Sequence, residues 1–157
     1  ISSRINNFPR TAKEIATIFN LDNTAATRGC KNAVHLLNAL EKDFENSDKT
    51  HFNQTNPVDF IERFCSRLNI SQEITKVCQF VALRIQNNNL IPENTPHSVA
   101  AGIIYFVALN CNLNINKHDV NKTSGISEVT INKCHKKLQL IKDQLIPSAI
   151  ISKYTSP

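Results

Sequence analysis

The sequence predicts an all-α protein. Its 157 residues include only three glycines and six prolines, too few for the many tight turns of a β-sandwich or a barrel. Apolar residues recur at intervals of three and four, which is the period of an amphipathic helix, and alternation typical of strands is rare. With 41% hydrophobic residues, a chain of this length can bury a substantial core and fits one domain, or one domain and part of a second.

The first 45 residues are expected to form two helices. The first covers about 11–19, with Ile15 and Ile18 facing inward, and the second covers about 24–43. The stretch 46–56 that follows is rich in Asn, Ser, Asp and Thr and has almost nothing to bury, so it is expected to be a linker.

Five more helices are expected after the linker. The third of them begins at Thr95-Pro96 and is apolar on nearly every side, which indicates a helix surrounded by other helices. Ser71 is a suitable N-cap for the second. The five helices are expected over 57–68, 72–88, 95–109, 116–123 and 128–145. The last residues, 151–157, are expected to form a tail.

The segment 123–138 has the pattern of the turn and second helix of a helix-turn-helix. Gly125 can adopt the positive φ that a tight interhelical turn requires, and Ile126 supplies an apolar plug. Ser127 is a suitable N-cap for a helix that begins at Glu128. One apolar stripe recurs along this helix at spacings of three and four: Ile131, Cys134, Leu138, Ile141 and Leu145.

Outside this stripe lies a face that a recognition helix would direct at base edges and phosphates, formed by Val129, Asn132, Lys133 and Lys136. From Lys117 onward the sequence has seven lysines and only three acidic residues, so the positive charge is concentrated around this helix. DNA is therefore the first partner that the sequence predicts. Taken alone, the helix also fits a solvated amphipathic helix whose lysines only maintain solubility.

The cysteines and histidines give little support for a metal site or an enzyme. The five cysteines are odd in number and widely spaced, without a Cys-x-x-Cys pair, and buried reduced thiols in an intracellular protein are the simplest interpretation. His97 with Ser98, and His135 beside Cys134, have no third group placed to orient a base, so no enzymatic activity is expected. The most apolar run, 99–109, is too short to span a bilayer, and no membrane association is expected.

The first segment of the chain also repeats the last one. At an offset of 105 residues, Ile15 aligns with Val120, and Leu21 aligns with Ile126. The apolar stripe of the second helix aligns in the same way with that of the last helix. Residues 1–45 are therefore interpreted as the end of a first copy of a unit whose second copy follows the linker.

Short motifs stand in a fixed order along nearly the whole chain. They are Pro9-Arg-Thr-Ala-Lys-Glu-Ile15, Phe64-Cys-Ser66, Leu90-Ile-Pro92, Pro96-His-Ser-Val-Ala-Ala101 with Ile104-Tyr105, and Gly125-Ile-Ser-Glu-Val-Thr-Ile131. In this order and spacing the sequence resembles the carboxy-terminal core of the general transcription initiation factor IIB family. That core consists of two cyclin-like repeats of five helices each.

The resemblance implies a domain organisation. Residues 1–45 would be the last two helices of a partial first cyclin-like repeat, 57–150 a whole second repeat ending in the helix-turn-helix, and 46–56 the linker between them. The family's zinc ribbon and the first three helices of its first repeat have no counterpart, so the chain is expected to be part of a longer factor. No cofactor is expected within it, because the ribbon would lie outside.

The resemblance also implies a function and partners. The core would bind the TATA-binding protein on promoter DNA and contact flanking DNA, to assemble the preinitiation complex. RNA polymerase would be recruited through regions outside this chain. The expected location is the nucleus, or the site of viral transcription in the host cytoplasm or virion, since the divergence would suit a viral copy.

At the level of single residues, Val129 matches the family's base-contacting valine, and Thr130 and Lys136 match positions of backbone contact. Lys137 would add to the basic surface with Lys133. Asn132 departs from the family, whose eukaryotic pattern has arginine there. Because asparagine pairs more often with adenine than with guanine, an A·T contact or no specific contact is expected at this position.

Two alternatives remain open at this stage. A cyclin-like module can bind protein without binding DNA, and a helical scaffold would have no salt-dependent affinity for DNA. In either case the basic face around Lys133 and Lys136 would be unexplained. The apolar stripe of the partial first repeat is expected to promote self-association, or to dock on the second repeat.

Overall fold

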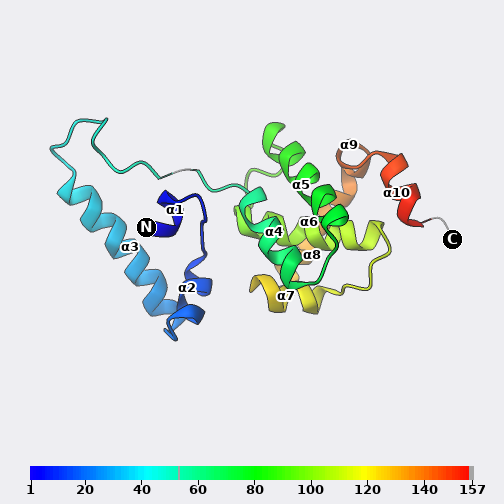
Figure 1. Cartoon of the computed structure of the whole chain (residues 1–157), viewed down its shortest axis with the longest axis horizontal. Coiled ribbons are helices and arrows are strands. Elements are labelled where there is room, and N and C mark those ends of the chain that lie inside the picture. The colour runs from blue at the N-terminus through cyan, green and yellow to red at the C-terminus, as the bar shows by residue number, and fades with distance from the viewer. Residues whose placement is uncertain (53, 156–157) are drawn as a thin grey trace. The chain divides into compact units, whose positions relative to one another are not determined.

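The computed structural model describes residues 1–52 and 54–155, and over these residues the protein is helical without any strand (Figure 1). The predicted all-α class is confirmed. The chain divides into two compact units, Ile1–Thr55 and Asn56–Pro157, called here the first and the second unit.

Within residues 1–52 the first unit has three helices, one more than the two expected from the sequence: α1 (Ser2–Ile5), α2 (Ala12–Ile18) and α3 (Asn23–Leu40). The helix α2 begins with a capping box, in which the Glu14 amide donates to the Thr11 hydroxyl at 3.1 Å and the Thr11 amide donates to the Glu14 carboxylate at 2.9 Å. Asp22 caps α3 by accepting hydrogen bonds from the amides of Thr24 and Ala25. These caps account for the helix starts that the sequence predicts.

Packing in the first unit is sparse, and two details of the sequence prediction are wrong. The buried residues of α2 and α3 are the small Ala16 and Ala26, so the two helices approach closely over a narrow seam. Ile18 lies outside this seam and is 62% exposed, whereas an inward position was expected. The helix α3 ends at Leu40 rather than at residue 43, and Glu41 beyond it accepts a hydrogen bond from the Thr50 amide.

The second unit is built around one buried helix. The helices α4 (Val58–Arg67), α5 (Gln72–Asn87), α7 (Lys117–Ser124) and α8 (Glu128–Leu140) all pack against α6 (Pro96–Asn110) (Figure 1). Eleven residues of α6 are buried, on every side of the helix, as its sequence predicts. The arrangement of four helices around a central third one is confirmed.

Two helices of the second unit, α6 and α8, approach each other closely at Gly102 of α6. A Cβ atom placed there would lie 2.5 Å from the Cβ of Cys134 and 3.6 Å from its Cα on α8. No real Cβ contact is that short, so α8 can take its position only because residue 102 is glycine. This contact fixes α8 against the core, and α8 carries the candidate DNA-binding residues.

The end of the chain differs from the prediction in two ways. The helix expected over 128–145 is interrupted at Ile141 (φ −115°, ψ 22°), and a short helix α9 (Lys142–Leu145) follows. The interruption redirects the chain so that Leu145 and Ile146 are both buried. The expected tail at 151–157 lies partly within a further helix, α10 (Ser148–Thr155), whose Ile150, Ile151 and Tyr154 pack against the core. Residues 156 and 157 lie outside the described residues.

An asparagine follows the end of five of the ten helices in the described part of the chain. Within residues 1–52 and 54–155, five asparagines have positive φ between 49° and 59°, each in the left-handed conformation that follows a helix: Asn7, Asn20, Asn69, Asn89 and Asn112. Each is followed by a large apolar residue whose amide bonds back into the last helical turn, as in the 3.1 Å bond from the Leu90 amide to the Ile85 carbonyl. A chain with so few glycines therefore uses asparagine, the next most tolerant residue, to end its helices.

The cysteines are all free thiols, and one of them was wrongly predicted to be buried. Cys65, Cys78, Cys111 and Cys134 lie in the core of the second unit, but Cys30 on α3 is exposed. The apolar stripe that predicted its burial has few neighbours in the sparsely packed first unit. Burial raises the pKa of the Cys111 and Cys134 thiols, which keeps both neutral.

Candidate nucleic-acid interface

The turn between α7 and α8 has the geometry expected of a helix-turn-helix. Gly125 ends α7 with φ 73°, a left-handed conformation that disfavours any residue with a Cβ. The Asn121 side-chain amide donates to the Ile126 carbonyl at 2.7 Å, and the Ser124 hydroxyl accepts from the Ile126 amide at 3.2 Å. Ser127 then caps α8 by accepting from the Thr130 amide. The Ile126 amide and carbonyl are thus satisfied within the turn, and these hydrogen bonds stabilise it locally.

One face of α8 is fixed in the core. Ile131, Cys134 and Leu138 are completely buried, and α8 packs along α6. A hydrogen bond between His118 Nδ1 and Glu128 Oε1, at 3.3 Å, joins α7 to the first turn of α8 on the surface. Because the buried stripe is fixed, the orientation of the opposite face of α8 is fixed as well.

That opposite face presents the residues singled out by the sequence. Val129 is 65% exposed, Lys133 and Lys136 are exposed, and Asn132 is half-buried between them on the same side of the helix. We call Val129, Asn132, Lys133 and Lys136 the α8 face. Thr130 lies at its edge, with its hydroxyl 2.9 Å from that of Ser127. An exposed apolar side chain flanked by two cations and an amide can contact a base edge while the cations bind phosphates.

Lys137 is arranged differently from the other lysines of α8. Its amine is hydrogen bonded to the Glu93 carboxylate and also donates to the Asn94 side-chain carbonyl at 3.1 Å. Both residues precede α6, so Lys137 ties α8 to that loop and its charge is largely compensated. Glu93 and Asn94 have no local sequence signal for this role, because 44 residues separate Glu93 from Lys137. A DNA contact by Lys137 stays a prediction.

Replacing Lys137 with alanine is expected to lower the melting temperature more than replacing Lys136, whose side chain is exposed on the α8 face. The hydrogen bond from Lys137 holds the pKa of the Glu93 carboxyl below its ordinary value of 4.5. A carboxyl with a lowered pKa contributes stability above its unfolded-state pKa, and that contribution disappears as the pH falls through the folded-state value. The difference between the two variants should therefore be present at neutral pH and vanish in acid. Thermal unfolding at both pH values measures it, and equal melting temperatures at neutral pH would contradict the assignment.

The residues considered for catalysis are engaged in packing. Ser98 is buried and accepts a hydrogen bond from the Thr95 hydroxyl at 2.8 Å, and Cys134 accepts one from the Asn94 side-chain amide. The position of His135 on the helix predicts a side chain that points away from the core, and the structure shows that this prediction is wrong. Its ring packs edge-on against Tyr105 with the centroids 5.1 Å apart, and burial lowers its pKa.

Neither a metal cluster nor a membrane-spanning helix is found in the part of the chain that the structure describes. Within residues 1–52 and 54–155, His, Cys, Asp and Glu side chains do not gather in groups of three or more that could hold a metal ion. Over the same residues, each helix is too short or too polar to cross a bilayer.

Comparison with known proteins places these helices in a family. Residues 50–141, which include α4 to α8 and the α8 face, match the family described as Transcription factor TFIIB repeat. A transcription initiation factor IIB-like protein of Acanthamoeba polyphaga mimivirus is 35% identical over 85% of this chain, which covers 29% of that protein.

Cellular proteins are similar over an even larger part of the chain. Transcription initiation factor IIB of Dictyostelium discoideum is 29% identical over 94% of it, and that of Drosophila virilis is 26% identical over its whole length. The chain spans less than half the length of each of these relatives. A family match over more than half of the chain, together with the cyclin-like arrangement around α6, shows that this chain belongs to the transcription initiation factor IIB family.

Proposed function

We propose that this chain is a core domain of a transcription initiation factor that binds the TATA-binding protein on promoter DNA and contacts the flanking duplex through α7 and α8. The single observation that carries the proposal is the α8 face, an exposed cationic surface on a helix-turn-helix within the family-matched region. Its role would be to assemble a complex rather than to catalyse a reaction. The relatives are named as initiation factors, which supports this.

The physical basis of the proposed function is the shape of bent promoter DNA. A protein that kinks the duplex brings the DNA on either side of the kink close enough for one small domain to contact both protein and groove. Lys133 and Lys136 would bind phosphates and fix the register, and Thr130 would contribute its hydroxyl at the edge. Val129 and Asn132 would reach base edges in the major groove. Asparagine in place of arginine favours an A·T pair over a G·C pair at the contacted position.

The remaining partners and the location follow from this role. RNA polymerase would be engaged by regions of a longer factor outside this chain, and a zinc ribbon would belong to those regions. The chain would act in the nucleus, or at the site of viral transcription if it is a viral factor. The similarity to a mimivirus protein supports the second possibility.

Fluorescence anisotropy of a labelled TATA-containing duplex tests the proposal. The chain alone is expected to bind weakly, and addition of TATA-binding protein from the same source is expected to tighten binding at least tenfold at low salt. The gain should be absent on a duplex whose TATA element is scrambled. Raising the salt should weaken the ternary complex, because each phosphate contact that the protein makes contributes about −0.9 to the slope of log K against log salt.

A failure to bind would favour the protein-binding alternative. If the TATA-binding protein produces no gain at any salt concentration, the chain would be a cyclin-like module without DNA binding. Tight binding that is independent of TATA-binding protein would instead contradict the proposal that this protein is the partner. It would not contradict DNA contact by the α8 face.

A further inference from the structure

Asn94, in the loop before α6, holds α8 with both ends of its side chain. The Lys137 amine donates to its side-chain carbonyl at 3.1 Å, and its side-chain amide donates to the Cys134 thiol at 3.2 Å. An ammonium group only donates hydrogen bonds, so the carbonyl faces Lys137 and the amide is left for Cys134. We call Glu93, Asn94, Cys134 and Lys137 the loop clamp, since Glu93 also accepts from Lys137.

The loop that carries Asn94 is itself fixed at both ends. Ile91 is buried in the core of the second unit, and the Asn94 backbone amide donates to the Ile91 carbonyl at 3.3 Å. The central helix α6 begins two residues after Asn94. The acceptors of the Lys137 amine therefore lie between a buried side chain and the most buried helix of the protein.

The loop clamp grips α8 at one edge. Cys134 and Lys137 are one helical turn apart, so Asn94 bridges two neighbouring side chains of the helix. Cys134 belongs to the buried stripe and is the residue that α6 approaches at Gly102. Lys137 also lies one turn after Lys133, so it stands between the buried stripe and the α8 face. A contact at this boundary resists rotation of α8 about its own axis.

The rotation of α8 decides which side chains point toward a DNA groove. Val129 and Asn132 lie near the start of α8, and the N-terminal residues of a recognition helix are the ones that contact base edges. Lys137 lies two turns beyond Val129, about 12 Å further along the axis. At that distance Lys137 does not extend the base contacts of Val129, but it sets their direction through the helix.

The lysines of the α8 face have a different environment. Lys133 and Lys136 are exposed, and within residues 1–52 and 54–155 neither forms an ion pair. Lys137 is half-buried and has a carboxylate and an amide carbonyl as acceptors. A cation that is already compensated by a carboxylate attracts phosphate less than an exposed cation does.

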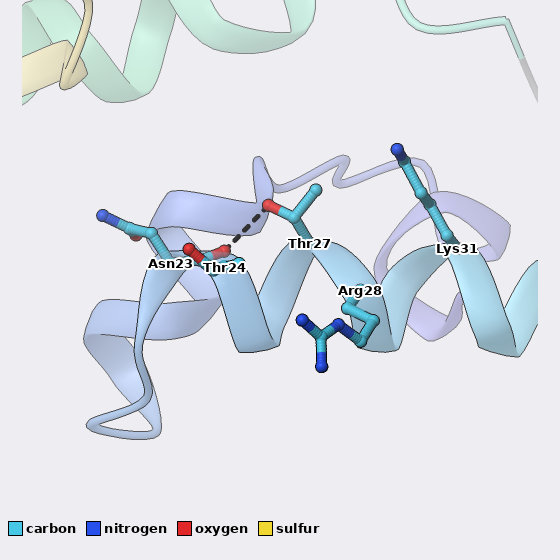
Figure 2. Close-up of a pocket in the computed structure, with 5 residues that line it drawn as sticks. All are labelled: Asn23, Thr24, Thr27, Arg28 and Lys31. Carbon is cyan, nitrogen blue, oxygen red and sulfur yellow. Dashed lines mark hydrogen bonds between the residues drawn. The ribbon is translucent and has the colours of Figure 1, made fainter.

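The helix α3 provides an internal comparison, because it aligns with α8 at the offset of 105 residues. The positions of Cys134 and Lys137 are held there by Gly29 and Asn32. Figure 2 shows the polar side chains along the first turns of α3, which line an open hollow of about 430 Å³ and include Thr27, whose hydroxyl bonds to a carbonyl of the same helix. A helix of this pattern therefore forms without the side chains of the loop clamp.

We propose that Asn94 and Lys137 are positioning residues, which fix the rotation of α8 and so direct Val129 and Asn132 at the bases, and that Lys137 makes no phosphate contact of its own. The inference rests on the proposed function, because it concerns how the α8 face reads DNA. It goes beyond that function by giving a role to Asn94, which lies outside the helix-turn-helix, and by assigning Lys137 to helix position instead of DNA contact.

The slope of log K against log salt separates positioning from direct contact. Asn94→Ala, Lys137→Met and Lys137→Arg are compared in the ternary complex with TATA-binding protein, on a labelled TATA-containing duplex with the flank that the unmodified chain selects from randomised sequences. The control is Lys136→Met, which removes the same charge from the neighbouring position. Circular dichroism at the assay temperature confirms that each variant keeps its helix content.

The control is expected to reduce the size of the slope by about 0.9, the value for one lost phosphate contact. Asn94→Ala and Lys137→Met should leave the slope unchanged and weaken binding about tenfold, because a misdirected side chain loses its base contact. The loss should be much smaller on a duplex whose contacted base pair is changed. Lys137→Arg keeps the charge and the donors and should bind like the unmodified chain. The two clamp substitutions together should cost less than their sum, since they break one network.

Three outcomes would overturn this inference and leave the proposed function intact. In the first, Lys137→Met lowers the slope as much as the control does, which would make Lys137 a phosphate contact. In the second, Asn94→Ala binds like the unmodified chain, so α8 keeps its position without the loop clamp. In the third, the unmodified chain selects no flank, so there is no base contact to direct. Failure of the proposed function is seen separately, as binding by the unmodified chain that TATA-binding protein does not strengthen, and the inference would fall with it.

Discussion

Replacing Gly102 with alanine is expected to lower the free energy of unfolding of the second unit by about 2–3 kcal/mol, which is a large part of the stability of a small domain. The new Cβ would lie 2.5 Å from the Cβ of Cys134, and backbone atoms of the same residue are 3.6 and 3.7 Å away. Neither side can move without shifting a whole helix. The gain of about 1 kcal/mol from replacing glycine in a helix offsets only part of this cost.

Urea unfolding measures the effect, and α3 offers a matched control. Gly29 also lies within a helix, but a Cβ placed there would have nothing within 4 Å. Gly29→Ala should therefore be neutral or stabilise the protein by up to about 1 kcal/mol. Destabilisation by Gly29→Ala, or tolerance of Gly102→Ala, would contradict the assigned helix packing.

A double-mutant cycle identifies the contact responsible. Cys134→Ala keeps the Cβ that collides with residue 102, so it should not rescue Gly102→Ala. Cys134→Gly removes that atom, and the two substitutions together should be less destabilising than their sum by about 2 kcal/mol. Additivity of Gly102→Ala and Cys134→Gly would show that the cost arises elsewhere.

The close approach at Gly102 illustrates what the sequence can and cannot predict. The period of three and four predicts each helix and the burial of α6, since both depend on residues next to one another in the chain. Which helix contacts Gly102 depends on tertiary packing. The same limit explains why the sequence does not predict the role of Lys137 in packing, because its acidic neighbour Glu93 is far away in sequence.

The errors at the end of the chain have another cause. Leu145 fits the helical period of the preceding stripe, so the sequence predicts one continuous helix, yet the chain bends at Ile141. In the structure Leu145 and Ile146 are both buried. Periodicity within one helix predicts the burial of Leu145 but not the bend at Ile141. The helix ends at asparagines were predictable in principle, because each asparagine precedes a large apolar residue such as Leu21 or Ile70.

The exposure of Ile18 and Cys30 was mispredicted because an apolar stripe predicts burial only where something covers it. Ile18, Leu36 and Leu40 fit such a stripe and are all more than half exposed. The self-association expected from this surface stays a prediction. The site residues are less affected, since the α8 face is defined by a helix whose buried side is fully packed.

Reversing the charges of the α8 face is expected to have the largest effect on DNA binding. Lys133→Glu with Lys136→Glu replaces two phosphate-binding cations with two anions that the backbone repels. The affinity of the ternary complex should fall about a hundredfold or more at low salt, and the salt slope should fall by about 1.8 or more. Both side chains are exposed and lie opposite the buried stripe, so the helix content and the melting temperature should change little.

A control with the same change in net charge separates a specific face from a general field. Lys76 on α5 and Lys142 on α9 belong to the same unit but not to the helix-turn-helix. If Lys76→Glu with Lys142→Glu weakens binding as strongly, the attraction comes from overall charge and the α8 face has no special role. If the control binds nearly normally, the DNA must lie against α8.

An Asn132→Arg variant should then shift selection among randomised flanks from A·T to G·C at one position, because arginine forms two hydrogen bonds with guanine and asparagine forms two with adenine. Unchanged selection would mean that Asn132 does not reach a base.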